Sequence, residues 1–162
     1  MTIIPEFWPS TKKLSETELD QLILEVDNKA EEWADEIRVQ STQTKDQLIL
    51  LHDLIARRID YDLAAENHAG CALLKGVTLC QGYAQAYQMI GQKLGHSVEM
   101  NSGLGVAFDH TWNLVFLDGS AYHVDLTYDD IYQDEGIPGL VSHRYLFRSD
   151  IAMQDTHHWD KP

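Results

Sequence analysis

The chain has little cysteine, few cations and no long apolar run. Its 162 residues include two cysteines, which are too few for a disulfide framework. Lysine and arginine together number 12 against 26 aspartates and glutamates, so the net charge is -14. A polyanion is therefore a disfavoured partner, and we expect binding to neither nucleic acid nor an anionic membrane.

The sequence also lacks targeting and membrane signals. No charged start followed by an apolar core marks a signal peptide, and the apolar runs are far shorter than the roughly 20 residues that cross a bilayer. We expect a cytoplasmic protein, or an extracellular one if the chain is a fragment of a larger secreted protein. The length suits one domain: we assign residues 1–14 to an N-terminal arm and residues 15–162 to that domain. The sequence does not indicate an oligomeric state.

The N-terminal part is patterned for helices. Ser15 is placed to cap a helix, and Glu18 completes a capping box, after which apolar residues recur at helical spacing. A second helix is predicted to begin near Thr44, with Gln47 in the reciprocal capping position. Residues 60–76 show little pattern, and we interpret them as a loop.

A change of period marks the C-terminal half. One more helix is predicted from about Cys80 to Leu94, before the pattern shifts towards alternation. Asp118-Gly119 between strand-like runs is typical of a hairpin turn. Strands are predicted in four segments: 98–100, 110–117, 120–127 and 143–148. Helices followed by strands indicate an α+β fold with an antiparallel sheet, against which the helix from Cys80 would pack.

Cys80 lies where an apolar run meets the start of this helix. The unpaired N–H groups and the positive end of the helix dipole favour the thiolate there, which is the reactive form of cysteine. A cysteine nucleophile needs a base, and the base needs a third group that fixes its tautomer. The chain holds eight histidines from which that base could come.

Hairpin register selects His110 and Asp125. A two-residue turn pairs Leu117 with Ser120, which sets Trp112 opposite Asp125. His110 lies two positions from Trp112 and so shares its face, which makes His110 and Asp125 diagonal neighbours. A three-residue turn would place them on opposite faces.

Two other residues compete for these roles. His123 shares the same face and is the rival base, but it lies deeper in the hairpin. Asp109 is the rival carboxylate, but it alternates away from His110. We therefore favour His110 with Asp125.

Three segments carry a resemblance to a known family. They are Cys-Gln-Gly-Tyr-Ala at 80–84, His-Thr-Trp-Asn at 110–113 and Tyr-His-Val-Asp-Leu-Thr-Tyr-Asp-Asp at 122–130. In this order they resemble the bacterial transglutaminase-like superfamily, over roughly residues 55–150. The resemblance implies a papain-like core and a catalytic Cys-His-Asp triad in that chain order.

Carried over position by position, the resemblance implies Cys80 as nucleophile, His110 as base and Asp125 as orienter. The thiolate would attack a peptide or carboxamide carbonyl, and water or an amine would resolve the thioester. The expected partners are a peptide or protein substrate and an amine or lysine acceptor. No cofactor and no metal are expected. One position departs from the family, because Thr78 stands where a glycine is common.

An oxyanion needs hydrogen-bond donors, and the backbone N–H of Cys80 is a natural one at a helix start. A second donor is required, and Tyr61 is our candidate. We add Gln81 and Trp112 as further candidates for oxyanion or substrate binding. Trp112 is also expected to lie beneath the site beside His110.

Other features have simpler interpretations. We interpret Cys71 as a core or loop residue, the pair His157-His158 as a solvated tail, and the acidic run 129–135 as a solvated loop rather than a calcium site. The alternative to an enzyme is a catalytically inactive transglutaminase-like domain that binds proteins.

Overall fold

The computed structural model of the protein describes residues 14–131 and 140–161. The predicted arm, residues 1–14, therefore lies outside the described residues except for Leu14. In chain order the elements are α1 (Glu16–Arg38), α2 (Thr44–Arg58), β1 (Asp60–Tyr61), α3 (Ala69–Lys75), β2 (Val77–Thr78), α4 (Cys80–Lys93), β3 (Val98–Leu104), β4 (Asp109–Leu117), β5 (Ser120–Val124), α5 (Leu126–Ile131) and α6 (Asp150–Met153).

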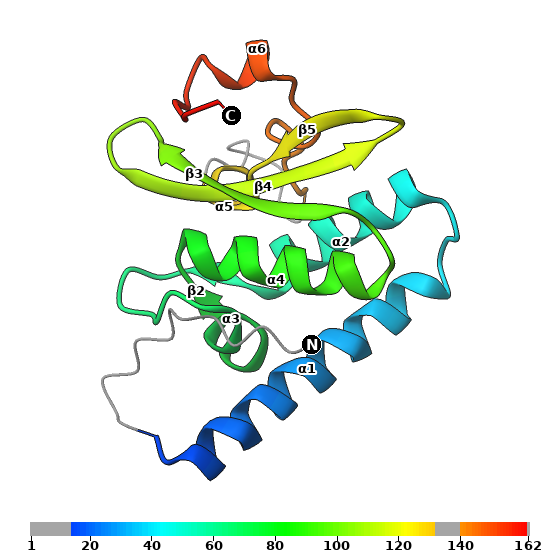
Figure 1. The fold of residues 1–162 in the computed structure, drawn as a ribbon, viewed down its shortest axis with the longest axis vertical. Coiled ribbons are helices and arrows are strands. Elements are labelled where there is room, and N and C mark those ends of the chain that lie inside the picture. Colours follow the sequence, from blue (N-terminus) through cyan, green and yellow to red (C-terminus); the bar gives the residue numbers. More distant parts are fainter. Residues whose placement is uncertain (1–13, 132–139, 162) are drawn as a thin grey trace.

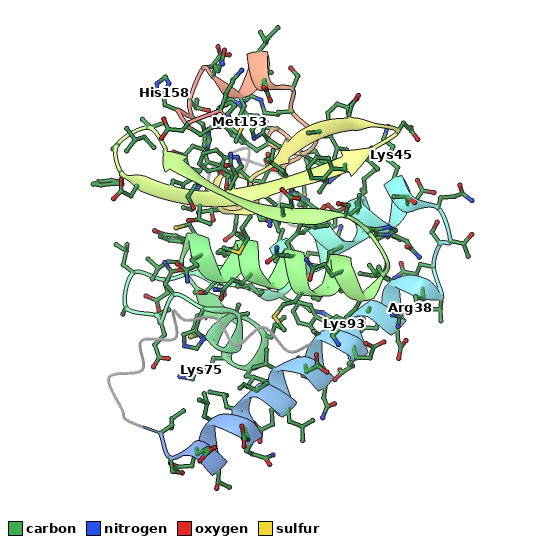
Figure 2. All side chains as sticks on the ribbon, viewed as in Figure 1. Arg38, Lys45, Lys75, Lys93, Met153 and His158 are labelled. Atoms are coloured by element: carbon green, nitrogen blue, oxygen red, sulfur yellow. The ribbon has the colours of Figure 1, made fainter. Side chains whose placement is uncertain are left out.

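A three-stranded sheet, in the order β3-β4-β5, separates two sides of the molecule (Figure 1). On one side α4 packs against β3 and β4, and α1 and α2 pack on α4. Residues 149–161, here called the C-terminal segment, lie on the other side. Figure 2 labels two residues of this segment, Met153 and His158. The predicted α+β class, with an antiparallel sheet covered by the helix from Cys80, is confirmed.

The helix starts agree only in part with the sequence. The capping box of α1 is present, since Ser15 Oγ accepts from the N–H of Glu18 and the Glu18 carboxylate accepts from the N–H of Ser15. The box predicted for α2 is wrong: Thr44 is the first helical residue, and the Gln47 amide donates to the carbonyl of Ser41 instead. No helix in the described ranges is long and apolar enough to cross a membrane.

The β4–β5 hairpin has the predicted register. Leu117 pairs with Ser120 across a two-residue turn, in which Asp118 and Gly119 have φ angles of 50° and 80°. Two central residues with positive φ match the twist of the strands. The parity that places His110 and Asp125 on one face is therefore confirmed.

Two predicted segments are wrong, and the strand predicted over 120–127 ends at Val124, since Leu126 and Thr127 belong to α5. Residues 60–76 are not a plain loop, because they contain β1 and the seven-residue helix α3. This helix is too short to show a period, and its cap is the imidazole of His68, which accepts from the N–H of Cys71. Segment 143–148 forms an isolated bridge between Arg148 and His123 rather than a strand.

Buried side chains gather on both sides of the sheet. The larger core lies between the helices and the sheet. The second is built from aromatic residues and one methionine against the C-terminal segment: Trp112, Tyr128, Tyr145, Met153 and the partly buried Trp159. Strand β4 is therefore enclosed, with Trp112 facing the C-terminal segment and Asn113 donating to the carbonyl of Ala84 in α4.

Candidate active site

Cys80 is the first residue of α4, as the sequence predicted. Both cysteines are free thiols; Cys71 is buried in α3, whereas Cys80 is partly exposed. The first N–H groups of a helix have no intrahelical acceptor, and they point their partial positive charge at this end. The backbone thus places an accessible thiol where an anion is stabilised.

Thr78, which departs from the family resemblance, fits its position through Gly82. Thr78 is buried in β2, and its hydroxyl donates to the carbonyl of Glu66 at 3.0 Å. A Cβ on Gly82 would lie 1.9 Å from Thr78 Oγ1, so the glycine of α4 makes room for the threonine. Thr78 therefore contacts both the first turn of α4, at Gly82, and the segment that carries Asn67, at Glu66.

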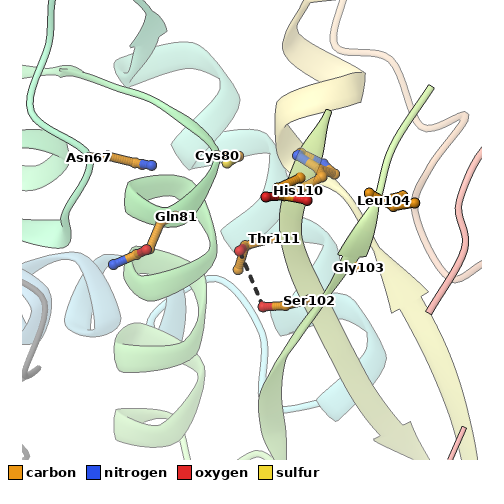
Figure 3. Close-up of a pocket in the computed structure, with 9 residues that line it drawn as sticks. Asn67, Cys80, Gln81, Ser102, Gly103, Leu104, His110 and Thr111 are labelled. Carbon is orange, nitrogen blue, oxygen red and sulfur yellow. Dashed lines mark hydrogen bonds between the residues drawn. The ribbon is translucent and has the colours of Figure 1, made fainter. Parts of the chain in front are cut away.

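Asn67 was not singled out from the sequence, yet it lies at the thiol. Its Oδ1 accepts from the N–H of Gly82 at 3.0 Å, which supplies a cap for α4 from outside the helix. With that oxygen engaged, the amide nitrogen points towards Cys80 (Figure 3). A side chain that caps across sequence-distant segments leaves no local motif.

His110 and Asp125 form the predicted pair. His110 Nε2 lies 2.7 Å from Asp125 Oδ2, and both residues are buried. A carboxylate accepts, so Nε2 carries a hydrogen, and Nδ1 is the nitrogen that can exchange a proton with the thiol. Figure 3 shows the ring of His110 and the sulfur of Cys80 facing each other. Asp125 is also held by the N–H of Tyr128, which donates to its Oδ1 at 3.1 Å.

The charges of this group favour an ion pair. Burial raises the pKa of the Cys80 thiol, but His110, the backbone of Thr111 and Asn67 together bring it below its ordinary value. Burial lowers the pKa of His110, but Asp125 and the thiolate outweigh this and raise it to about 9. The two imidazoles on Asp125 outweigh its burial and lower the pKa of that carboxyl. Both shifts favour the thiolate–imidazolium pair over the neutral thiol–imidazole pair.

The solvated tail predicted for His157-His158 is wrong for its first member. His157 is 0% exposed, and its Nε2 lies 2.7 Å from Asp125 Oδ2, the same oxygen that His110 contacts. His158 is exposed, as expected. The burial arises because the C-terminal segment folds back over the sheet, which no pattern around residue 157 indicates.

Trp112 lies beneath His110 rather than in the cleft. It is 1% exposed, and its ring stacks on that of His110 with centroids 5.8 Å apart. Its Nε1 donates to Nδ1 of His123, whose other nitrogen contacts Asp150. The rival base His123 is thus enclosed by Trp112 and Asp150, and we count Trp112 among the residues that support the imidazole.

A cleft of about 570 Å³ opens at Cys80, between the start of α4 and the ends of β3 and β4. Gln81 lines it, although its side chain extends away from His110 in Figure 3. Burial raises the pKa of the Tyr61 phenol, and the nearby charge of Cys80 raises it further. The full lining is Asn67, Cys80, Gln81, Ser102, Gly103, Leu104, Asp109, His110 and Thr111.

The solvated acidic loop is also wrong in part. Asp129 is 1% exposed and accepts from Ser142 Oγ and from the N–H of Tyr145, and it contacts His52 Nε2 at 2.9 Å. Residues 132–135 lie outside the described residues. The burial of Asp129 results from docking of α5 on α2, which brings His52 to it.

Two groups have donor atoms close enough to hold a metal ion. In the described ranges they are His52–Asp53–His143 and His110–Asp125–His157. The second is fully buried, and its nitrogens are already hydrogen-bonded to the shared carboxylate. Neither group contains a cysteine.

Comparison with known proteins supports the architecture. No family model and no curated protein matches the sequence. A crystal structure described as a TGase matches with a TM-score of 0.59 and 12% identity, over 72% of this chain and 34% of that chain. The fold is transglutaminase-like.

A proposed cysteine protease from Cytophaga hutchinsonii also aligns, with a TM-score of 0.47 and 15% identity, over 50% of this chain and 30% of that chain. The chain spans about a third of the length of the TGase structure, since the alignment covers 34% of it.

Proposed function

We propose that this transglutaminase-like protein catalyses cysteine-dependent acyl transfer on a peptide or carboxamide carbonyl, with Cys80, His110 and Asp125 as its triad. The observation that carries the proposal is the imidazole of His110, which faces the thiol with one nitrogen and a buried carboxylate with the other. This is the arrangement that activates a nucleophile and later delivers a proton. The transglutaminase-like fold supports it.

Acylation begins when the Cys80 thiolate attacks the carbonyl carbon and the C–S bond forms. The oxyanion would lie between the backbone N–H of Cys80 and the amide of Asn67, which points towards the thiol. The imidazolium of His110 then gives its proton to the leaving amine as the C–N bond breaks. Asp125 keeps the ring oriented throughout.

The thioester is resolved by water, which gives an acid, or by an amine, which gives a new amide. In either case Nδ1 of His110 accepts the proton of the attacking group, and the thiolate leaves. Asp109 lines the cleft, and none of the nine lining residues drawn in Figure 3 is a lysine or arginine. An acceptor that is cationic in solution, such as a lysine side chain, therefore suits the cleft, and its ammonium must lose one proton before the nitrogen attacks.

Iodoacetamide labelling at about pH 6 tests the thiolate, because an unperturbed thiol reacts slowly there. We expect fast labelling of Cys80, slow labelling of the buried Cys71, and loss of the fast phase in His110→Ala. Equal, slow labelling of both cysteines would contradict the proposal. It would favour the alternative, a catalytically inactive protein-binding domain.

A second assay separates the two outcomes of acyl transfer. A glutamine peptide is offered with and without a primary amine, and ammonia and adduct are both measured. Ammonia without adduct in both cases identifies hydrolysis, whereas adduct formation identifies transamidation. Asp109→Asn should weaken the use of a cationic amine while leaving the alkylation of Cys80 unchanged.

A further inference from the structure

One oxygen of the proposed catalytic carboxylate serves two histidines. Asp125 Oδ2 lies 2.7 Å from Nε2 of His110 and 2.7 Å from Nε2 of His157. Asp125 and His157 are both 0% exposed. A Cys-His-Asp mechanism uses the first of these contacts and leaves the second unexplained.

The hydrogen bonds define which nitrogens carry hydrogen. Because a carboxylate oxygen only accepts, each imidazole presents an Nε2–H to it. Thr156 Oγ1 lies 2.8 Å from the other nitrogen of His157, so its hydroxyl can donate there. Two imidazolium rings with centroids 5.5 Å apart would repel, so the positive charge belongs to the histidine that also faces the thiolate, His110.

The position of His157 depends on the edge of β3. Leu104 and His158 exchange two backbone hydrogen bonds, of 2.7 and 2.9 Å. A Cβ on Gly103 would lie 2.2 Å from the carbonyl oxygen of His158, so only glycine admits the C-terminal segment at this distance. Gly103 and Leu104 also line the cleft. The C-terminal segment therefore pairs directly with residues that line the cleft.

We infer that His157 is a positioning residue of the active site: it divides the charge of Asp125 Oδ2 between two imidazoles and makes the C-terminal segment part of the catalytic machinery. This inference rests on the proposed function. Without His157 the carboxylate would still be held by the N–H of Tyr128 on Oδ1, but all the charge of Oδ2 would act on His110. His110 would then hold its proton more tightly and release it more slowly to a leaving amine.

The titratable side chains that face these two imidazoles come from several elements packed around them. Around His110 and His157 the titratable neighbours are Cys80 from α4, Asp125 after β5, Tyr128 from α5, Tyr145, and His123 from β5. Of these, Asp125 alone contacts both rings by hydrogen bonds among the described residues. A change at His157 should therefore reach His110 through Asp125.

The test measures the rate of Cys80 alkylation by iodoacetamide from about pH 5 to 10 in the full chain, without any substrate. In the wild type we expect an upper inflection near pH 9, where His110 loses its proton. His157→Phe and His157→Leu remove the N–H donor, so their upper inflection should move to higher pH. His157→Gln keeps an N–H donor and should restore the wild-type inflection. His158→Gln is the matched control on the adjacent, exposed histidine and should change nothing.

Each outcome has one meaning. An upward shift in the apolar variants with rescue by His157→Gln supports the inference. An unchanged inflection, or a downward shift towards the ordinary histidine pKa in all three variants, would show that His157 only packs the segment. Slow alkylation of Cys80 in the wild type would instead contradict the proposed function itself. Circular dichroism identifies any variant that fails to fold. If one of the two apolar variants fails, the other is compared with His157→Gln.

Discussion

Two clusters in this molecule are each made of two histidines that share one aspartate oxygen. In one, Asp125 Oδ2 lies 2.7 Å from both His110 and His157. In the other, Asp53 Oδ1 lies 3.1 Å from His52 and 2.6 Å from His143. Geometry within each cluster is therefore similar, and it does not separate a site from a structural contact.

The surroundings separate them. The Asp125 cluster faces a thiol at a helix start and a cleft. The Asp53 cluster instead contacts the buried carboxylate of Asp129 through His52, and no contact with a cysteine is seen for it among the described residues. His143 is about half exposed and comes from the segment that follows residues 132–139, so the second cluster joins that segment to α2. A histidine–aspartate pair becomes chemically useful through what its free nitrogen meets.

The largest difference between the clusters is expected when a fully buried carboxylate is neutralised in each region: Asp125, which the first cluster shares, and Asp129, which His52 of the second cluster contacts. Asp125→Asn should lower acyl transfer by about 100- to 10,000-fold, because the amide disturbs the tautomer of His110. Asp129→Asn should leave turnover within about twofold, yet lower the free energy of unfolding by about 1–3 kcal/mol, because it leaves buried donors and His52 poorly paired. Chemical denaturation and single-turnover kinetics measure the two effects. If Asp129→Asn kept its fold but lost most of its activity, the Asp53 cluster would also contribute to the reaction, and the distinction between the two clusters would be wrong.

Asn67 sharpens the comparison, because it lines the cleft that the Asp125 cluster faces, together with Cys80 and His110. If its amide stabilises the oxyanion, Asn67→Ala should lower kcat by about 100- to 1,000-fold. Asn67→Asp keeps the oxygen that caps Gly82 but removes the donor, so it should lower kcat equally while keeping the melting temperature nearer to wild type. Tyr61→Phe is the control, and a larger loss there would assign the second donor to Tyr61.

The same contrast explains what the sequence could predict. Asp118-Gly119 determined the turn, the turn determined the parity, and the parity brought His110 and Asp125 together, so this pair needed only local rules, whereas Cys80 was added to it through the family resemblance. The sequence did not predict the positions of Asn67 and His157, because each reaches the site from another segment. Asn67 caps α4 from outside the helix, and His157 lies in a segment that folds back over β4. Contacts of this kind depend on tertiary packing, and a histidine in a polar C-terminal run has the same local pattern whether it is buried or solvated.

The pH dependence of stability should differ from that of activity. The pKa of His110 is raised to about 9 in the folded protein, so its contribution to folding is complete below the ordinary pKa of about 6.5 and is lost as pH rises through about 9. Activity should fall over the same upper range as the proton for the leaving amine disappears. Denaturant unfolding at about pH 6, 7.5 and 9 should show this loss in the wild type, and a smaller one in His110→Ala.

The smallest effect is expected at the outer histidine of the second cluster. His143 and His157 each contact the shared aspartate oxygen of their cluster, but the side chain of His143 is 47% exposed and that of His157 is 0% exposed. Water can replace an exposed partner, so His143→Ala should cost less than about 1 kcal/mol of unfolding free energy. The alkylation profile of Cys80 should be unchanged. A shift in that profile would mean that α5, which lies between the two clusters and carries Asp129, transmits the state of one to the other.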